Sequence, residues 1–171
     1  MSKTRTHIRW GLMLCAALVV LFSRANACSV VKLDSPSDLI QQADGIYLVV
    51  ARDFAQSPAV GRHTAGTVRF SISETLKGAE RKELRIPGFF TDADDPNDHP
   101  VPYEFVRPEG RHGNCYAEAY REGRMYLFFV KGGTPYWSPL APVNEQVTSE
   151  SDSWVEWVRQ HLRFTEALRS R

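Results

Sequence analysis

The clearest hydrophobic pattern in the chain is an alternation of apolar and polar residues over Thr67–Leu76. Val68, Phe70 and Ile72 fall on one face, while serine, threonine and arginine fall on the other. A period of two residues is typical of a strand with one buried face. Glu74 interrupts the pattern by falling on the apolar face, and we expect a solvated charge near the rim of the sheet.

Other apolar runs predict further strands. Ile46–Ala51 is apolar on both faces, which favours a central strand. Met125–Val130 is an apolar run rich in aromatic residues, and Glu83–Ile86 is a short alternating strand. Tyr136–Ser138 can add a short strand as a hairpin partner, but neighbouring prolines limit it to an edge.

Two segments predict helices. Ser35–Ile40 reads as a cap followed by a short helix that ends near Ala43. Near the end of the chain, Ser153 and Glu156 have the spacing of a capping box, and Arg159 falls on the solvent side of the helix that follows. Its apolar stripe predicts packing against a core, with the tryptophans as anchors. The stripe consists of Trp154, Trp157, Val158, His161, Leu162, Thr165 and Leu168.

Taken together, these elements predict a mainly β fold. The expected architecture is a five-stranded OB-fold-like barrel with a C-terminal amphipathic helix packed outside it. The segment Phe89–Asn114 has no hydrophobic period and reads as a proline-stiffened, solvated loop. Its Asp92-x-Asp94 pair lacks the ordered spacing of a calcium loop, so we expect no resident metal or cofactor.

The first residues have the three parts of a secretory signal peptide. Basic residues precede a short apolar run, Trp10–Phe22, and Ala25-x-Ala27 follows it. The run is shorter than the roughly 20 residues of a membrane-spanning helix, and no other apolar run reaches that length. We therefore expect residues 1–27 to be a cleaved signal peptide and residues 28–171 a single exported domain, periplasmic, secreted or extracellular, with no transmembrane helix.

Removal of this leader changes the charge of the chain. The leader contains Lys3, Arg5, Arg9 and Arg24, and none of the 20 acidic residues that oppose the 21 basic ones. The remaining domain is net acidic, which argues against nucleic acid as its main partner.

Cys28 and Cys115 are the cysteines that remain after cleavage. In an exported domain they most simply form one disulfide. Lipid attachment at Cys28 is disfavoured because Ala25 stands where a lipoprotein signal usually has leucine. A thiolate nucleophile formed by Cys115 and His112 would require a free Cys115, so we expect no enzymatic activity.

The order of these pieces resembles the netrin-like, or tissue-inhibitor-of-metalloproteinases-like, family of OB-fold domains. The resemblance lies in Cys28, Ala43–Tyr47, Val68–Gly78, Cys115 and Gly123–Phe129. It implies a five-stranded barrel and a disulfide that joins the N-terminal cysteine to the later one. It also implies a role in binding other proteins.

In the inhibitory members of that family, the α-amine and carbonyl of the N-terminal cysteine chelate the zinc of a metalloprotease. The corresponding atoms here belong to Cys28, and the resemblance implies that Ser29 and Val30 form the inhibitory ridge. Inhibitory members begin Cys-x-Cys, whereas Val30 occupies the second cysteine position. We therefore favour an exported, non-catalytic protein-binding module, with a metalloprotease inhibitor as the alternative.

Overall fold

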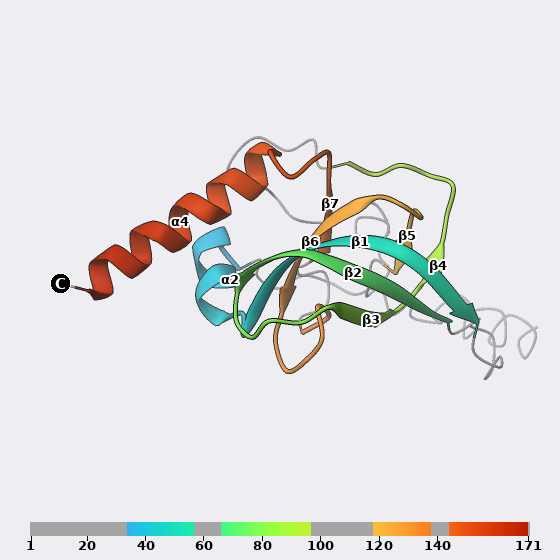
Figure 1. The fold of residues 1–171 in the computed structure, drawn as a ribbon, viewed down its shortest axis with the longest axis horizontal. Coiled ribbons are helices and arrows are strands. Elements are labelled where there is room, and N and C mark those ends of the chain that lie inside the picture. Colours follow the sequence, from blue (N-terminus) through green and yellow to red (C-terminus); the bar gives the residue numbers. More distant parts are fainter. Residues whose placement is uncertain (1–33, 57–65, 97–117, 138–143, 171) are drawn as a thin grey trace, which may run out of the picture.

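The computed structural model describes residues 34–56, 66–96, 118–137 and 144–170 (Figure 1). Every strand predicted from Thr67–Leu76, Ile46–Ala51, Glu83–Ile86 and Met125–Val130 is present, as are both helices. The elements, in chain order, are α2 (Pro36–Gln42), β1 (Gly45–Gln56), β2 (Gly66–Lys77), β3 (Glu83–Pro87), β4 (Phe89–Phe90), β5 (Ala119–Tyr120), β6 (Met125–Val130), β7 (Asn144–Val147) and α4 (Ser153–Arg169).

Five strands form one antiparallel sheet in the order β3-β2-β1-β6-β7. The central place of β1 confirms the prediction made from its two apolar faces. The expected hairpin partner at Tyr136–Ser138 is wrong in its described part, because Tyr136 and Trp137 lie outside any strand and β7 pairs with β6 instead. β4 and β5 form a separate two-stranded parallel pair.

The mainly β fold with a C-terminal helix is confirmed, but the closed barrel is wrong. β3 and β7 are the two edges of an open sheet. The physical reason lies in β1 and β6, whose side chains are buried on both faces. A barrel of this size fills its interior from one face of each strand, whereas strands that are apolar on both faces need a covering layer on each side.

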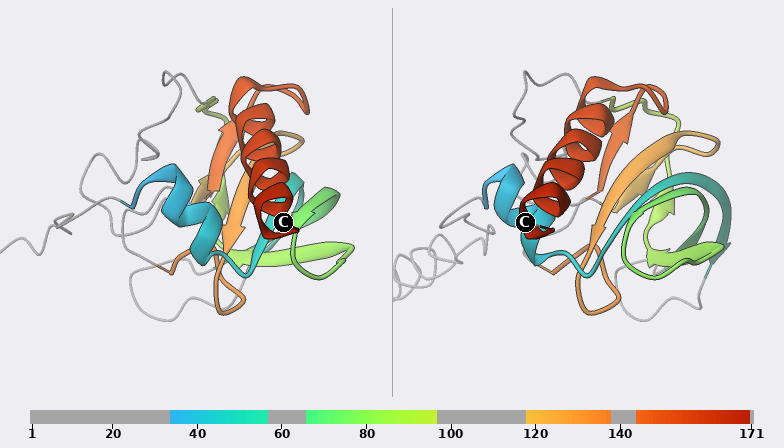
Figure 2. Two further views of the ribbon diagram at one scale, coloured as in Figure 1. Left: turned by 90° about the vertical axis from the view of Figure 1, so that its left-hand side faces the viewer. Right: turned by 60° about the vertical axis from the view of Figure 1, so that its left-hand side comes forward.

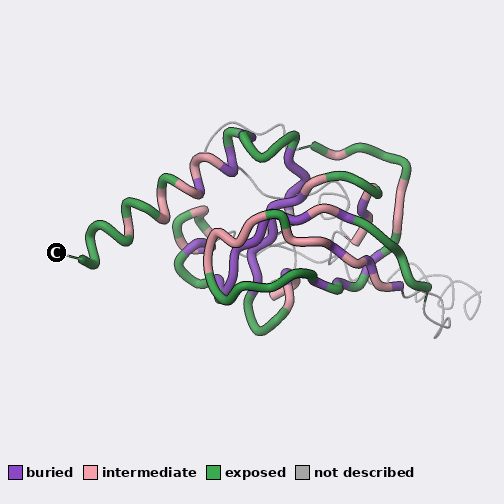
Figure 3. Tube along the Cα trace, in the orientation of Figure 1, coloured by how far each residue is buried: buried purple, intermediate pink, exposed green. Residues whose placement is uncertain are grey.

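Helices α2 and α4 lie side by side and cover one face of the sheet (Figure 2). We call the apolar layer beneath them the helix-side core. It consists of Leu39, Ile40 and Ala43 near α2, Ile46, Leu48, Leu127, Phe129 and Val147 from the sheet, and Trp154, Val155 and Val158 from α4. The buried segments converge on the centre of the sheet, whereas the far half of α4 is largely exposed (Figure 3).

The other face of the sheet carries the aromatic core. Its centre is Phe70, whose ring meets those of Tyr120 and Phe128 edge-on, with centroids 4.9 and 4.8 Å away. Edge-to-face pairs of this kind add to the free energy gained by burial. The full cluster is Tyr47, Val49, Ala51, Val68, Phe70, Leu84, Ile86, Tyr120, Tyr126, Phe128 and Val130.

A β-bulge in β2 explains the position of Glu74. Ile72 pairs with Val49 of β1 and Glu74 pairs with Leu48, so Ser73 is an extra residue without a partner. An extra residue shifts every side chain after it to the opposite face. The Ser73 hydroxyl donates a hydrogen bond to the carbonyl oxygen of Leu48 at 3.1 Å. Glu74 consequently lies on the helix side of the sheet, although the simple alternation places it with Phe70.

Glu74 forms an ion pair with Arg159 of α4, which joins the sheet to the helix. The Arg159 side chain is 17% exposed and also binds Glu156. Two expectations are therefore wrong: Arg159 does not face solvent, and Glu74 is not merely a solvated charge at the rim. The hydrogen bond that Arg159 donates to Glu74 raises the pKa of Arg159 above its ordinary value; burial opposes this with a smaller effect, and the negative charges of Glu74 and Glu156 raise the pKa further.

The start of α4 differs from the expected capping box. The capping box predicts Ser153 as the N-cap, whereas the helix already includes Ser153 and its N-cap is Asp152. The Asp152 carboxylate accepts hydrogen bonds from the backbone N–H groups of Trp154 and Thr148, both at 2.9 Å. A carboxylate at this position satisfies free N–H groups of the first turn and suits the helix dipole.

Candidate functional site

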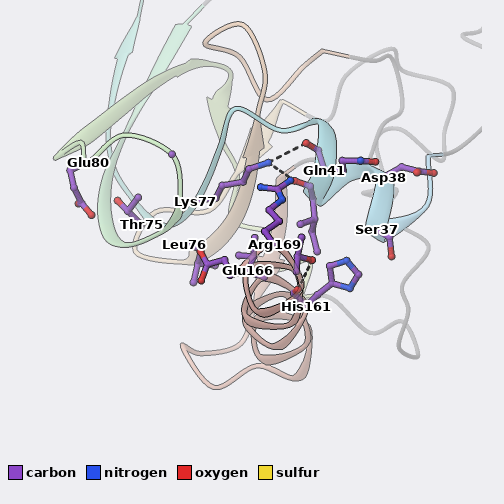
Figure 4. A pocket seen from close by; sticks show the side chains of 14 residues that line it. Ser37, Asp38, Gln41, Thr75, Leu76, Lys77, Glu80, His161, Glu166 and Arg169 are labelled. Atoms are coloured by element: carbon purple, nitrogen blue, oxygen red, sulfur yellow. Dashed lines mark hydrogen bonds between the residues drawn. The ribbon is translucent and has the colours of Figure 1, made fainter. Parts of the chain in front are cut away.

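A pocket of about 570 Å³ lies at the junction of α2, the end of β2 and the second half of α4 (Figure 4). This volume falls within the range of about 300–1,000 Å³ that is common for small-ligand pockets. Ile40, Leu76 and Leu162 supply apolar lining, one from each of the three elements. Polar and charged side chains of the same elements provide the rest of the lining.

Lys77 fixes one wall of this pocket. It is the last residue of β2, and its Nζ donates hydrogen bonds to the carbonyl oxygens of Ile40 at 2.7 Å and Gln41 at 3.2 Å. The last carbonyl groups of a helix lack partners within the helix, so these bonds hold the end of α2 against β2. Gly78 allows the close turn that follows: its φ is +90°, and a Cβ there would lie 2.5 Å from the carbonyl oxygen of Asp44.

Two cations face one another in the pocket. Figure 4 shows the Arg169 side chain directed toward Lys77. Burial lowers the pKa of Lys77, the positive charge of Arg169 lowers it further, and the attraction of Asp44 opposes both with a smaller effect. None of the ion pairs within the described residues includes Arg169.

Three acidic side chains, those of Asp38, Glu80 and Glu166, also line the pocket. Asp38 accepts a hydrogen bond from the Ser35 hydroxyl at 2.8 Å, beside the first turn of α2. Glu80 belongs to the turn after β2 and lies on the far side of the pocket in Figure 4. Glu166 is exposed on α4. Lys77 and Arg169 thus bring two positive charges together in a pocket whose wall also carries three carboxylates.

An apolar strip runs along α4 beside the pocket. We call it the α4 ridge and define it as Trp157, Phe164 and Leu168, which share one side of the helix because residues at spacings of 4, 7 and 11 lie nearly in line. Phe164 is 64% exposed and Leu168 is 56% exposed. Leu168 thus belongs to the predicted stripe, but it is not packed against the core.

A stack of rings connects the ridge to the helix-side core. Phe129 stacks on Trp154 at 5.9 Å, Trp154 on Trp157 at 5.2 Å, and Trp157 on His161 at 5.1 Å between ring centroids. The prediction of core anchors is confirmed for the fully buried Trp154, and Trp157 is partly buried against the same core. His161 ends the stack and lines the pocket. The stack therefore gives the ridge and the pocket wall a firm base.

A second charged cluster surrounds Asp94, beyond the aromatic core. Its carboxylate forms ion pairs with Arg121 at 2.8 Å and Arg124 at 2.7 Å. It also accepts a hydrogen bond from the Gln146 side-chain amide at 2.5 Å, and that bond is the largest cause of a lowered Asp94 pKa. Asp94 is thus exposed, as expected of a solvated loop, but it is held by donors of β7 and the β5–β6 turn. The predicted loop is wrong at its start, where Phe89 and Phe90 form β4, and its residues 97–114 lie outside the described ranges.

The residues that sequence reasoning placed in a site are not among those that the structure describes. Cys28, Ser29, Val30 and Cys115 lie outside the described ranges, as does the leader 1–27. The disulfide and the chelating N-terminus therefore stay predictions. Within the described ranges, no group of three or more His, Cys, Asp and Glu side chains is placed to hold a metal ion.

The sequence did not predict that the two cations Lys77 and Arg169 lie close together in the pocket. In the sequence, Lys77 follows the alternating strand and precedes a glycine, and Arg169 is a basic residue near the end of a helix, where basic residues are common. Their positions in the sequence carry no sign that they meet.

Comparison of the sequence with protein-family models and with curated proteins finds no match. Neither of the two described helices is long and apolar enough to cross a membrane.

Proposed function

We propose that this chain is an exported, non-catalytic protein-binding module of the netrin-like type, and that it binds its partner with the α4 ridge. The observation that carries the proposal is the exposure of Phe164 and Leu168 on a helix that is anchored through Trp157 and Trp154. Contiguous apolar side chains at a surface mark interaction sites, and aromatic residues on a rigid base commonly supply most of the binding energy.

The chemistry of the partner follows from the surroundings of the ridge. Arg169 is adjacent to Leu168 in the sequence, and Lys77 lies near Arg169 in the neighbouring pocket. A partner that covers the ridge would place its own residues over these cations, so charge complementarity favours an apolar protein segment that also carries a carboxylate.

The test is a pair of substitutions on α4. Phe164→Asp with Leu168→Asp should weaken partner binding at least tenfold and leave the unfolding midpoint nearly unchanged, since both side chains are largely exposed. Arg163→Asp, on the exposed polar side of the same helix, is the matched control. The partner is first identified by a photo-crosslinking residue at position 164 and then purified for a direct binding measurement.

Two results would contradict the proposal. Equal partner binding by the doubly substituted and wild-type proteins would remove the ridge from the interface. A dimer of this chain that is detected by sedimentation and abolished by the same two substitutions would identify a second copy as the occupant of the ridge, instead of a different protein.

The inhibitor alternative depends on Cys28 and is proposed from the sequence alone. A disulfide to Cys115 would hold the N-terminal amine in place, so little ordering entropy would be lost when it binds an open zinc position. One residue added before Cys28, or acetylation of its amine, should abolish inhibition of a sensitive zinc protease without loss of stability. No inhibition by the authentic N-terminus across a panel of such proteases would eliminate this alternative.

A further inference from the structure

The pocket beside the α4 ridge combines two positively charged side chains with an adjacent apolar lining. Lys77 and Arg169 supply the positive charges, and Leu76 and Leu162 are apolar lining residues next to them in the pocket wall. A ligand that matches both the cations and the apolar lining has a negatively charged group within a few bonds of an apolar group.

Lys77 has the capacity to bind such an anion. Its ammonium group has three N–H donors, and two of them are used by the carbonyl oxygens of Ile40 and Gln41. These carbonyl groups hold the side chain in place without neutralising its charge. The repulsion from Arg169 is larger than the attraction of Asp44, so the field at Lys77 favours an added negative charge.

Arg169 supplies the second half of an anion site. Its guanidinium has no ion-pair partner within the described residues and reaches into the pocket from the last turn of α4 (Figure 4). A planar guanidinium matches a carboxylate through two parallel hydrogen bonds. An anion placed between Arg169 and Lys77 would also relieve the repulsion between them.

We infer that this pocket binds the C-terminal carboxylate of a partner protein whose last residue is apolar, with the carboxylate between Lys77 and Arg169. The last apolar side chain would lie against Leu76, Leu162 and Ile40. The inference rests on the proposed protein-binding function and names the part of the partner that is recognised.

The closeness of the charged and apolar parts favours a chain end over an acidic side chain. In a C-terminal leucine the carboxylate and the isobutyl group leave the same Cα atom. In aspartate or glutamate the carboxylate occupies the tip of the side chain, and no branched apolar group accompanies it. Capture of a terminal carboxylate is an established mode of peptide recognition.

The experiment titrates the processed protein with matched probes while NMR follows the side-chain signals of Lys77 and Arg169. The probes are N-acetyl-Ala-Ala-Leu with a free carboxylate, the same peptide as its C-terminal amide, and N-acetyl-leucine. We expect the peptide acid to bind at least tenfold more tightly than the peptide amide, and more tightly than N-acetyl-leucine. Both side-chain signals should move with the acid.

Matched variants separate the anion site from the fold. Arg169→Gln should weaken binding of the peptide acid at least fivefold and leave binding of the amide unchanged, because only the acid uses the guanidinium. Arg163→Gln, on the polar side of α4, should change neither. Arg169 is exposed in the last turn of the helix, so its substitution should preserve the unfolding midpoint.

Several outcomes overturn the inference. They are equal affinity for acid and amide, no binding of any probe, or N-acetyl-leucine binding as tightly as the peptide acid, which would assign the pocket to small free acids. Failure of the carboxylate inference is distinguishable from failure of the proposed function. If Arg169→Gln retains the crosslinked partner while the Phe164→Asp, Leu168→Asp protein loses it, the ridge proposal stands and the carboxylate inference falls.

Discussion

The two faces of the sheet are covered in different ways. On one face, rings from β5 and β6 pack edge-on around Phe70 of β2 and leave it fully buried. On the other face, two helices form the cover, and the polar side chains of Arg159 and Lys77 tie these helices to the sheet. The aromatic side is closed, whereas the helix side continues into a pocket and an exposed ridge. Both faces contain a buried core, and the two surfaces that we propose for binding lie on the helix side.

The largest expected effect separates a core ring from a surface ring. Phe70→Ala should cost about 3–5 kcal/mol of unfolding free energy, because it leaves a cavity at the centre of the aromatic core. Phe164→Ala, on the exposed ridge, should change it by less than about 0.5 kcal/mol. Urea unfolding of both proteins measures the difference. A loss below about 1 kcal/mol for Phe70→Ala would show that Phe70 does not pack as a core residue.

An intermediate effect is expected from the ion pair that joins α4 to β2. Arg159→Met should cost about 1–3 kcal/mol, because it leaves the half-buried Glu74 without its partner. Glu74→Gln with Arg159→Met should recover part of that loss, since neither charge then remains. A double-mutant cycle measures the coupling between the two residues.

Hydrogen exchange locates the effect of the same substitution. Amides of α4 should exchange faster in the Arg159→Met protein, while amides of β1 and β2 near Phe70 should stay protected, because only the helix layer is released. Uniform acceleration across the sheet would mean that the two faces unfold as one unit. That result would contradict the division between them.

The smallest expected effect concerns Asp94 and its dependence on pH. Hydrogen bonding from Gln146, with the charges of Arg121 and Arg124, lowers the Asp94 pKa below its ordinary value of 3.8. A carboxyl group whose pKa is lower in the folded protein stabilises the fold above pH 3.8, and this contribution is lost as the pH falls through the folded-state value. Asp94→Asn should therefore be less stable than wild type at pH 7.

The difference in unfolding free energy between wild type and the Asp94→Asn protein should narrow as the pH falls from 3.8 through the lower pKa of Asp94 in the folded state. Unfolding measured across this pH range makes the comparison, with Asp92→Asn as a control at a nearby exposed position. A difference that stays constant with pH would show that Asp94 acts through the shape of its side chain and not through its charge.

Most of the strands were predictable because their signal is local. Alternation around Phe70 and the apolar run Met125–Val130 each reflect contacts that every residue of the strand makes with its own layer. Closure of a sheet is not local. It depends on whether the first and last strands meet, and β7, which holds the edge beside β6, contains the polar residues Asn144, Glu145 and Gln146 and has no apolar pattern.

The candidate site was less predictable than the fold. Lys77 and Arg169 lie far apart in the sequence, and no motif links them. Glu74 did give a signal, because it interrupts the alternation of apolar and polar residues in β2. Such an interruption marks an unusual position, but it does not predict which residue the carboxylate will contact. The pairing with Arg159 required the register of β2 against β1, which includes the bulge at Ser73.

That bulge acts on the strand as a single-base insertion acts on a reading frame. Before Ser73, every second residue belongs to the aromatic core, and after it the assignment is inverted, so Glu74 reaches toward α4. If Ser73 itself paired with Leu48, as unbroken alternation would require, Glu74 would lie opposite Tyr47 and its charge would enter the aromatic layer. One extra residue with a small side chain therefore decides which layer of the protein receives the Glu74 charge.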